Sequence, residues 1–287
     1  MTAETDRIAA AALAEDGDRD VTTAVTVPQG LPAEGVIEYR SGGVLAGAAF
    51  ADAVARACEC RIDWRAPDGR LFPPGATAGI IHGHLVRILR AERPLLNLLQ
   101  RACGIATLTR AYVDAVAGLP CRILHTRKTA PGLRSLDIAA VIAGGGERHR
   151  ADLSHEVMVK DNHWQTLVRN GGDLARALSD GRALGVTALY VEVESEAQVD
   201  EACRAGATRL LVDNQAPAIV RRWGDEARRT RPGIEIEATG GITLENVRSY
   251  AEAGADFVSV GALTHSVRAV DLALEVRAAD GSPLAHG

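Results

Sequence analysis

The sequence predicts an α/β fold whose larger part is an open barrel of parallel strands. Six short apolar runs each stop at a charged, hydroxyl-bearing or glycine residue, and stretches with helical spacing lie between them. Strand, polar tip and helix in repetition is typical of a parallel α/β barrel with its ligand site at the strand ends. The six runs are Cys121–Leu124, Val157–Val159, Leu189–Val193, Leu210–Val212, Ile234–Ala238 and Phe257–Val260.

An internal repeat within these runs supports the barrel. Cys203–Ala207 leads into Arg209–Val212, and Ala251–Ala255 leads into Phe257–Val260. Each copy has the form of a helix end, a glycine C-cap and a buried parallel strand. A complete eight-stranded barrel usually needs about 250 residues, and the six runs occupy a much shorter stretch. We therefore expect an incomplete or open barrel of six strands.

The chain before Cys121 has a mixed α+β pattern. Its expected elements, in order, are a helix at Thr5–Leu13, a loop at Asp18–Thr23, a strand at Glu34–Tyr39, a helix at Ala48–Cys58, a strand at Ala78–His82 and a helix at Glu92–Val116. Gly104 is expected to interrupt the last helix, because glycine is a poor helix former. The tail from Asp271 is expected to return to this N-terminal region as a helix or strand.

Composition limits the classes of function. The chain has 287 residues, enough for one large domain or two ordinary ones, and 47% of them are hydrophobic. Only 3% are aromatic, so the core must consist mostly of Ala, Val, Leu and Ile. A net charge of −5 argues against general affinity for nucleic acid or for an anionic membrane. No apolar stretch approaches the roughly 20 residues that span a bilayer.

The N-terminus and the cysteines favour a cytoplasmic protein. Met1–Asp6 has neither the basic nor the apolar region of a signal peptide. An odd number of cysteines without CxxC spacing favours buried free thiols over a metal or disulfide site. The cysteines are Cys58, Cys60, Cys103, Cys121 and Cys203.

Cations gather at the ends of the first two predicted barrel strands. Arg127 and Lys128 follow the first strand, and Lys160 ends the second. His149 and Arg150 follow three consecutive glycines, where the backbone can approach a ligand closely. Arginine pairs with carboxylate through a bidentate fork. Because strand ends in this architecture point into one mouth, the pattern predicts a polyanionic ligand; the alternative is a solvated surface cluster.

Two acids mark later strands of the barrel. Glu192 lies within an otherwise apolar run, and Asp213 directly follows one. Carboxylates near bound phosphates usually hold Mg²⁺ or the hydroxyls of a sugar. The alternative is that they pair with the neighbouring lysines and arginines, and the two interpretations are compatible.

The last two predicted strands end in glycines. Thr239-Gly240-Gly241 follows one strand and Ser259-Val260-Gly261 ends the other. Backbone N–H groups at such tips, with the next helix N-terminus, form a phosphate cradle. His163 and His265 also lie at tips, although a single histidine is more often structural. The sequence contains no HExxH, GxSxG or P-loop motif and no supported nucleophile–base arrangement.

Several segments together resemble the quinolinate phosphoribosyltransferase family. His125–Arg134 resembles its TRKTxPGxR segment, Gly144–Arg150 its GGGxxHR segment and Val159–His163 its IKDNH segment. Further similar segments are Glu92-Arg93 with Asn97, Gly104–Thr107, Leu211–Asn214, Thr239–Ile242, Ser259–Ser266, Asp20–Thr23 and Gly43–Gly47. The resemblance spans nearly the whole chain, and TRKTxPG followed by KDNH is highly specific.

The resemblance implies an architecture and an assembly. It implies an N-terminal α/β sandwich at residues 1–110, completed by 270–287, and an open six-stranded α/β barrel at 111–269. It also implies a homodimer or a higher homo-oligomer. The partners would be small-molecule substrates, with no nucleic acid and no membrane.

The resemblance also implies roles for individual residues. The two carboxylates of quinolinate would be bound by Arg127, His149, Arg150 and Lys160, and by Arg93 reaching in from the partner subunit. The catalytic residues facing phosphoribosyl pyrophosphate (PRPP) would be Lys128, Glu192 and Asp213. Glu192 and Asp213 would hold Mg²⁺, directly or through water. The 5-phosphate would lie against Thr239, Gly240, Gly241, Gly261 and His265.

The implied reaction is phosphoribosyl transfer from PRPP to quinolinate with decarboxylation, which gives nicotinate mononucleotide for NAD biosynthesis. The sequence departs from the family pattern at His125, Arg148, Asp152 and His155, where aspartate, asparagine, glycine and aspartate are usual. Because these positions cluster beside the acid-binding segments, a paralogue that uses a different aromatic or pyridine acid is a second hypothesis. A catalytically silent sugar-phosphate-binding protein on the same fold is a third.

Overall fold

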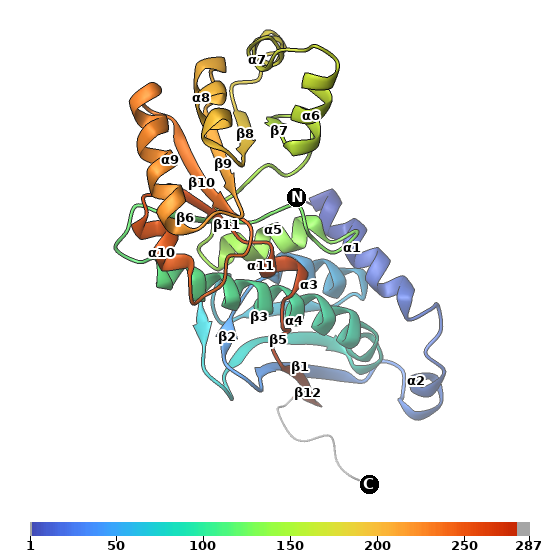
Figure 1. The fold of residues 1–287 in the computed structure, drawn as a ribbon. Coiled ribbons are helices and arrows are strands. Elements are labelled where there is room, and N and C mark those ends of the chain that lie inside the picture. Colours follow the sequence, from blue (N-terminus) through green and yellow to red (C-terminus); the bar gives the residue numbers. More distant parts are fainter. Residues whose placement is uncertain (1, 280–287) are drawn as a thin grey trace. The chain divides into compact units, whose positions relative to one another are not determined.

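The computed structural model describes residues 2–279 and divides into two compact units (Figure 1). The first contains the chain up to Arg110, Thr129–Gly145 and the stretch from Leu263; the second contains Ala111–Lys128 and Gly146–Ala262. Residues 280–287, part of the predicted completion of the N-terminal domain, lie outside the described residues. Within residues 2–279, no helix combines the length and apolar character that a membrane span requires.

A four-stranded antiparallel sheet forms the centre of the first unit, in the order β12-β1-β5-β3. Its strands are β1 (Pro32–Tyr39), β3 (Arg61–Trp64), β5 (Thr77–His84) and β12 (Leu272–Ala278). Alternate residues of β1 are buried, which confirms the half-buried strand predicted from its apolar–polar alternation. Two short strands, β2 (Gly43–Val44) and β4 (Leu71–Phe72), form a separate antiparallel pair.

Helices accompany this sheet: α1 (Thr2–Glu15), α2 (Val21–Thr26), α3 (Ala48–Ala57), α4 (Leu85–Ala115) and α5 (Arg134–Ala143). The loop predicted at Asp18–Thr23 is partly wrong. Helix α2 begins at Val21 because the Asp20 carboxylate accepts a hydrogen bond from the backbone N–H of Thr23 at 2.9 Å. This N-cap stabilises a helix of only six residues, three of which are threonines.

The predicted break at Gly104 is also wrong, because α4 is continuous across it. A Cβ at this position would lie 2.3 Å from the backbone oxygen of Arg268. The glycine therefore permits a close approach of the chain to the helix rather than ending it.

The second unit holds six parallel strands in the order β6-β11-β10-β9-β8-β7, which confirms the open barrel. They are β6 (Arg122–Leu124), β7 (Val157–Val159), β8 (Leu189–Val193), β9 (Arg209–Asp213), β10 (Glu235–Thr239) and β11 (Phe257–Ser259). The helices between them are α6 (Asp161–Arg169), α7 (Leu174–Ala183), α8 (Glu196–Ala205), α9 (Pro217–Thr230) and α10 (Val247–Glu252). The next helix, α11 (Ala262–His265), belongs to the first unit from Leu263 onward. Consecutive strands β6 and β7 form the two edges of the sheet.

The strand register stacks polar side chains in layers on one face of this sheet. Arg209 pairs with Tyr190 on one side and Glu235 on the other, so these three residues share a layer. The next layer toward the carboxyl ends contains Glu192, Leu211, Glu237 and Phe257. Asp213 and Thr239 pair at the carboxyl ends of β9 and β10. Parallel strands thus bring residues from distant parts of the sequence to one edge.

Candidate active site

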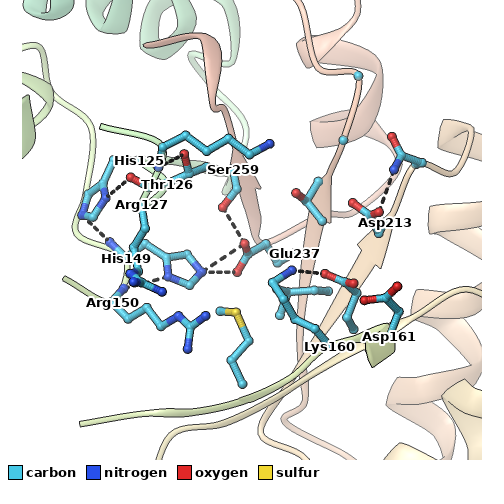
Figure 2. Close-up of a pocket in the computed structure, with 18 of the residues that line it drawn as sticks. His125, Thr126, Arg127, His149, Arg150, Lys160, Asp161, Asp213, Glu237 and Ser259 are labelled. Carbon is cyan, nitrogen blue, oxygen red and sulfur yellow. Dashed lines mark hydrogen bonds and ion pairs between the residues drawn. The ribbon is translucent and has the colours of Figure 1, made fainter. Parts of the chain in front are cut away.

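A cavity of about 540 Å³ opens at the carboxyl ends of the barrel strands and lies wholly within the second unit (Figure 2). The predicted site residues that line it are Arg127, Lys128, His149, Arg150, Lys160, Glu192, Asp213, Thr239, Gly240 and Gly241. The lining does not include Gly261, nor Arg93 and His265, which belong to the first unit.

Two arginines give one side of the cavity its positive charge. Burial and the nearby charge of Arg127 lower the pKa of Arg150, although a guanidinium stays protonated in proteins. Within the described part of the chain, the buried Nε of Arg127 has no hydrogen-bond partner. Buried donors are normally paired. Repulsion between the two cations and an unused donor both favour an anionic ligand here.

His149 lies beside these arginines with both ring nitrogens already engaged. Its Nε2–H donates to the Glu237 carboxylate, at 3.1 and 3.2 Å from the two oxygens. Its Nδ1 accepts a hydrogen bond of 2.7 Å from the backbone N–H of Arg150. This pattern fits the neutral Nε2–H tautomer. His149 was predicted to bind a substrate carboxylate, but in this conformation neither of its ring nitrogens is free to do so.

His125 also contacts the backbone of the segment that contains His149 and Arg150. It is fully buried, its Nδ1–H donates to the backbone oxygen of Thr126 at 3.2 Å, and its Nε2 accepts from the backbone N–H of His149 at 3.1 Å. Burial lowers the pKa of His125, which keeps the ring neutral and Nε2 free to accept. His125 thus acts on the backbone next to the arginines.

Lys160 and Glu192 form an ion pair on the opposite side of the cavity. Glu192 is on β8, while Lys160 follows β7 and caps α6. The backbone N–H of Lys160 donates to Nδ1 of His163 at 3.0 Å, a structural role for that histidine. The pair gives the carboxylate a fixed partner.

Asp213 lies near Glu192 and accepts a hydrogen bond of 2.6 Å from the side chain of Asn214. Burial and the charge of Glu192 raise the pKa of Asp213, against the opposing charges of Lys160 and Lys128. Two mutually repelling carboxylates facing one cavity fit a hard divalent cation, since Mg²⁺ commonly takes one or two carboxylates plus substrate phosphates. Among residues 2–279, no cluster of three His, Cys, Asp or Glu side chains has metal-binding geometry.

The turn after β10 brings bare backbone to the cavity. Gly240 and Gly241 have φ values of +80° and +61°, in the left-handed region. A Cβ on Gly240 would lie 2.2 Å from Oδ1 of Asn214. The glycine therefore leaves room for the side chain that contacts Asp213.

Family models match nearly the whole chain. The model of the quinolinate phosphoribosyltransferase N-terminal domain matches residues 20–103, and that of the C-terminal domain matches residues 105–275. The chain belongs to the quinolinate phosphoribosyltransferase family. This membership confirms the resemblance found in the sequence motifs.

Individual proteins similar to this chain agree with this assignment. The chain is 38% identical to the carboxylating nicotinate-nucleotide pyrophosphorylase of Mycobacterium leprae, over 90% of this chain and 91% of the relative. It is 36% identical to the chloroplastic enzyme of Arabidopsis thaliana, over 92% of this chain and 80% of the relative. The structure is similar to that of the Francisella tularensis nicotinate-nucleotide pyrophosphorylase, with a TM-score of 0.88, 30% identity and coverage of 96% and 97%.

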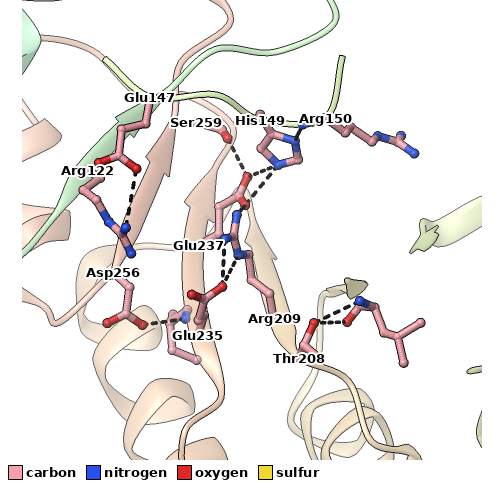
Figure 3. Close-up of polar contacts among 12 residues, drawn as sticks. Arg122, Glu147, His149, Arg150, Thr208, Arg209, Glu235, Glu237, Asp256 and Ser259 are labelled. Carbon is pink, nitrogen blue, oxygen red and sulfur yellow. Dashed lines mark hydrogen bonds and ion pairs between the residues drawn. The ribbon is translucent and has the colours of Figure 1, made fainter. Parts of the chain in front are cut away.

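Two buried charged residues were overlooked in the sequence analysis. Glu237 is fully buried and contributes to the cavity wall, and Arg209 lies one layer below it (Figure 3). A signal existed: Glu235 and Glu237 alternate with apolar residues in a run read as uniformly apolar, and Arg209 begins the preceding strand. Charge at alternate positions of a barrel strand indicates a polar interior.

Proposed function

We propose that this chain transfers the phosphoribosyl group of PRPP to quinolinate, with loss of pyrophosphate and CO₂, and so makes nicotinate mononucleotide. The observation that supports this most strongly is the division of one cavity into two sides. One side presents the guanidinium groups of Arg127 and Arg150, and the other presents the carboxylates of Glu192 and Asp213. A dianionic ring binds to cations, whereas carboxylates stabilise the positive charge that develops on the sugar when pyrophosphate leaves.

In this proposal the cationic side binds the two carboxylates of quinolinate. Arg127 contributes its unpaired Nε and Arg150 its charge. Bidentate contacts with guanidinium groups fix the plane of a carboxylate as well as its position. Lys160 lies in the same cavity and adds a third cation. The ring nitrogen is thereby aimed at the sugar.

The sugar phosphate occupies the acidic side. The lone pair of the ring nitrogen attacks C1 of the ribose, and the bond from C1 to pyrophosphate breaks with its electrons going to the leaving group. Glu192 and Asp213 stabilise the positive charge that develops on the ribose ring. Lys128 neutralises the departing oxygens. The bond to the 2-carboxylate then breaks, the alkylated ring accepts the electron pair, CO₂ leaves and the carbon takes up a proton.

Glu192 and Asp213 would also hold Mg²⁺, whose charge offsets that of the pyrophosphate. We extend the proposal to a homodimer in which Arg93 completes the acid site of the partner subunit. Arg93 is 58% exposed on α4, with Glu92 at 3.8 Å as its ion-pair partner, so it can turn toward another chain.

The test is incubation with PRPP, Mg²⁺ and quinolinate labelled in its 2-carboxylate. Labelled CO₂ and nicotinate mononucleotide should appear in equal amounts. Lys128→Ala is the negative control: it removes the cation proposed to neutralise the departing pyrophosphate, so neither product should appear. Nicotinate or another pyridine acid reacting while quinolinate stays inert would replace the proposed substrate. Binding of PRPP without turnover of any acid would indicate a silent sugar-phosphate-binding protein.

A further inference from the structure

Glu237 is a fully buried carboxylate that accepts hydrogen bonds from three donors in the wall of the cavity (Figure 3). His149 donates through Nε2–H at 3.1 Å and Ser259 through its hydroxyl at 2.5 Å. Arg209 donates through Nη1 at 3.1 Å from the layer below. An ionised carboxylate only accepts, so three donors match its charged form. Burial opposes ionisation, but the contacts of His149, Ser259 and Arg209 together lower the pKa of Glu237.

Arg209 balances this buried charge. Its side chain is 9% exposed and pairs with both Glu237 and Glu235. The guanidinium carbon also lies 3.8 Å from the centroid of the Phe257 ring and 4.6 Å from that of Tyr190. Aromatic faces and two carboxylates therefore hold the arginine rigidly.

The contacts continue from Glu237 to the arginine side of the cavity. Glu237 orients His149, whose Nδ1 accepts from the backbone N–H of Arg150. The ring of His149 also packs edge-on against Tyr190, with centroids 5.8 Å apart. Neither ring nitrogen of His149 is left for a ligand. The histidine is therefore held in one orientation, in which it positions the backbone of Arg150.

We infer that Glu237 is a positioning residue that acts through His149 to place Arg150 for binding of the acid substrate. This inference rests on the proposed function for the identity of that acid. It predicts that loss of the Glu237 charge weakens binding of the acid. Binding of PRPP should be nearly unchanged, because PRPP is proposed to bind beside Glu192 and Asp213 on the other side of the cavity.

The test compares Glu237→Gln with Glu235→Gln in the full-length protein. Both variants remove one carboxylate from the same strand and from the same arginine, but Glu235 has no contact with His149 and does not line the cavity. Glu237→Gln should raise the KM for quinolinate about tenfold and change kcat and the KM for PRPP less than about twofold. Glu235→Gln should leave all three near wild type. Equal effects of the two variants, or equal rises in both KM values, would overturn the inference.

A second readout does not depend on turnover. Nitrogen NMR of protein labelled in histidine, assigned with His149→Asn, should show a slowly exchanging Nε2–H for His149 in wild type and in Glu235→Gln. The same proton should exchange faster with solvent in Glu237→Gln, because a neutral amide oxygen accepts a weaker hydrogen bond than a carboxylate. Unchanged exchange in Glu237→Gln would refute the inference. Faster exchange in Glu237→Gln, together with a wild type that makes no nicotinate mononucleotide, would refute only the proposed function.

Glu237→Gln leaves Arg209 with one carboxylate, and it is the variant at risk of misfolding. The double variant Glu237→Gln/Arg209→Met removes both members of the buried pair, which is usually tolerated better than removal of one. It still lacks the carboxylate that orients His149. The same rise in the KM for quinolinate is expected, and a wild-type KM in this folded variant would contradict the inference.

Discussion

Lys160 and Glu192 form an ion pair across the neighbouring strands β7 and β8, at the carboxyl edge of the barrel sheet. The Glu192 side chain is 7% exposed, whereas that of Lys160 is 42% exposed. The pair therefore anchors a nearly buried acid with a cation that still faces the cavity. It joins a residue predicted to bind the acid substrate to one predicted to face PRPP.

Lys160→Ala should raise the KM for the acid substrate strongly. The substitution removes a cavity cation and leaves Glu192 without its ion-pair partner beside Asp213. A charge-assisted contact is worth roughly 1.5–3 kcal/mol, so we expect a rise of about ten- to a hundredfold. Steady-state kinetics with PRPP held saturating measures this. Arg169→Ala, at the other end of α6, is the control; a wild-type KM in Lys160→Ala would remove this lysine from the acid site.

His125 should make stability depend on pH in the weakly acidic range. Its pKa in the folded protein lies below the ordinary value of 6.5, because burial disfavours the charged ring. The unfolded chain therefore binds this proton at a higher pH than the folded chain does. The contribution of His125 to stability is complete above pH 6.5 and is lost as the pH falls from 6.5 toward the pKa of the folded protein. The contribution of one such group is at most about 1.4 kcal/mol per pH unit.

Urea unfolding of wild type and His125→Gln between pH 7.5 and 5 checks this prediction. Glutamine can still accept from the backbone N–H of His149 but does not titrate. The variant should therefore show a flatter pH dependence. His155→Gln is the matched control, because that ring is 80% exposed and pairs with Asp152 at the surface. Equal slopes in all three proteins would show that His125 does not titrate on unfolding.

Gly240→Ala should impair PRPP binding more than Gly241→Ala. Both positions have a left-handed backbone, which costs a non-glycine residue about 1–2 kcal/mol. Only at Gly240 would the new Cβ collide with a neighbour, Oδ1 of Asn214, at 2.2 Å. Displacement of Asn214 would free Asp213 from its hydrogen bond. Thermal unfolding should show a loss of stability in both variants, whereas the KM for PRPP should rise clearly in Gly240→Ala only.

If the two alanine variants raise the KM for PRPP equally, the Asn214 contact has no separate role. The comparison isolates that contact because the two glycines share the same turn, and nothing lies within 4 Å of a Cβ on Gly241.

The sequence predicted the barrel and most of the cavity because both follow from local patterns. Apolar runs that end in polar tips define parallel strands, and parallel strands bring those tips together. The two interior layers that contain Arg209 and Glu237 escaped prediction because a charge in a strand looks like an exposed residue until the register shows which side chains share a face. Gly104 was misread for a related reason, since its neighbour Arg268 is distant in sequence.

The last prediction concerns Arg93, whose proposed role lies in the partner's site. Arg93→Ala and Lys128→Ala should each be nearly inactive alone, but a mixture refolded together should regain activity. Random pairing places both defects in one site of a mixed dimer and leaves the other intact, so about a quarter of all sites should be wild type. The control mixes Arg127→Ala with Lys128→Ala, two residues that line one cavity of a single chain, and should show no recovery. Recovery in neither mixture would mean that Arg93 acts within its own subunit, because every site would then carry a defect. Full activity of Arg93→Ala alone would mean that Arg93 has no role in the site.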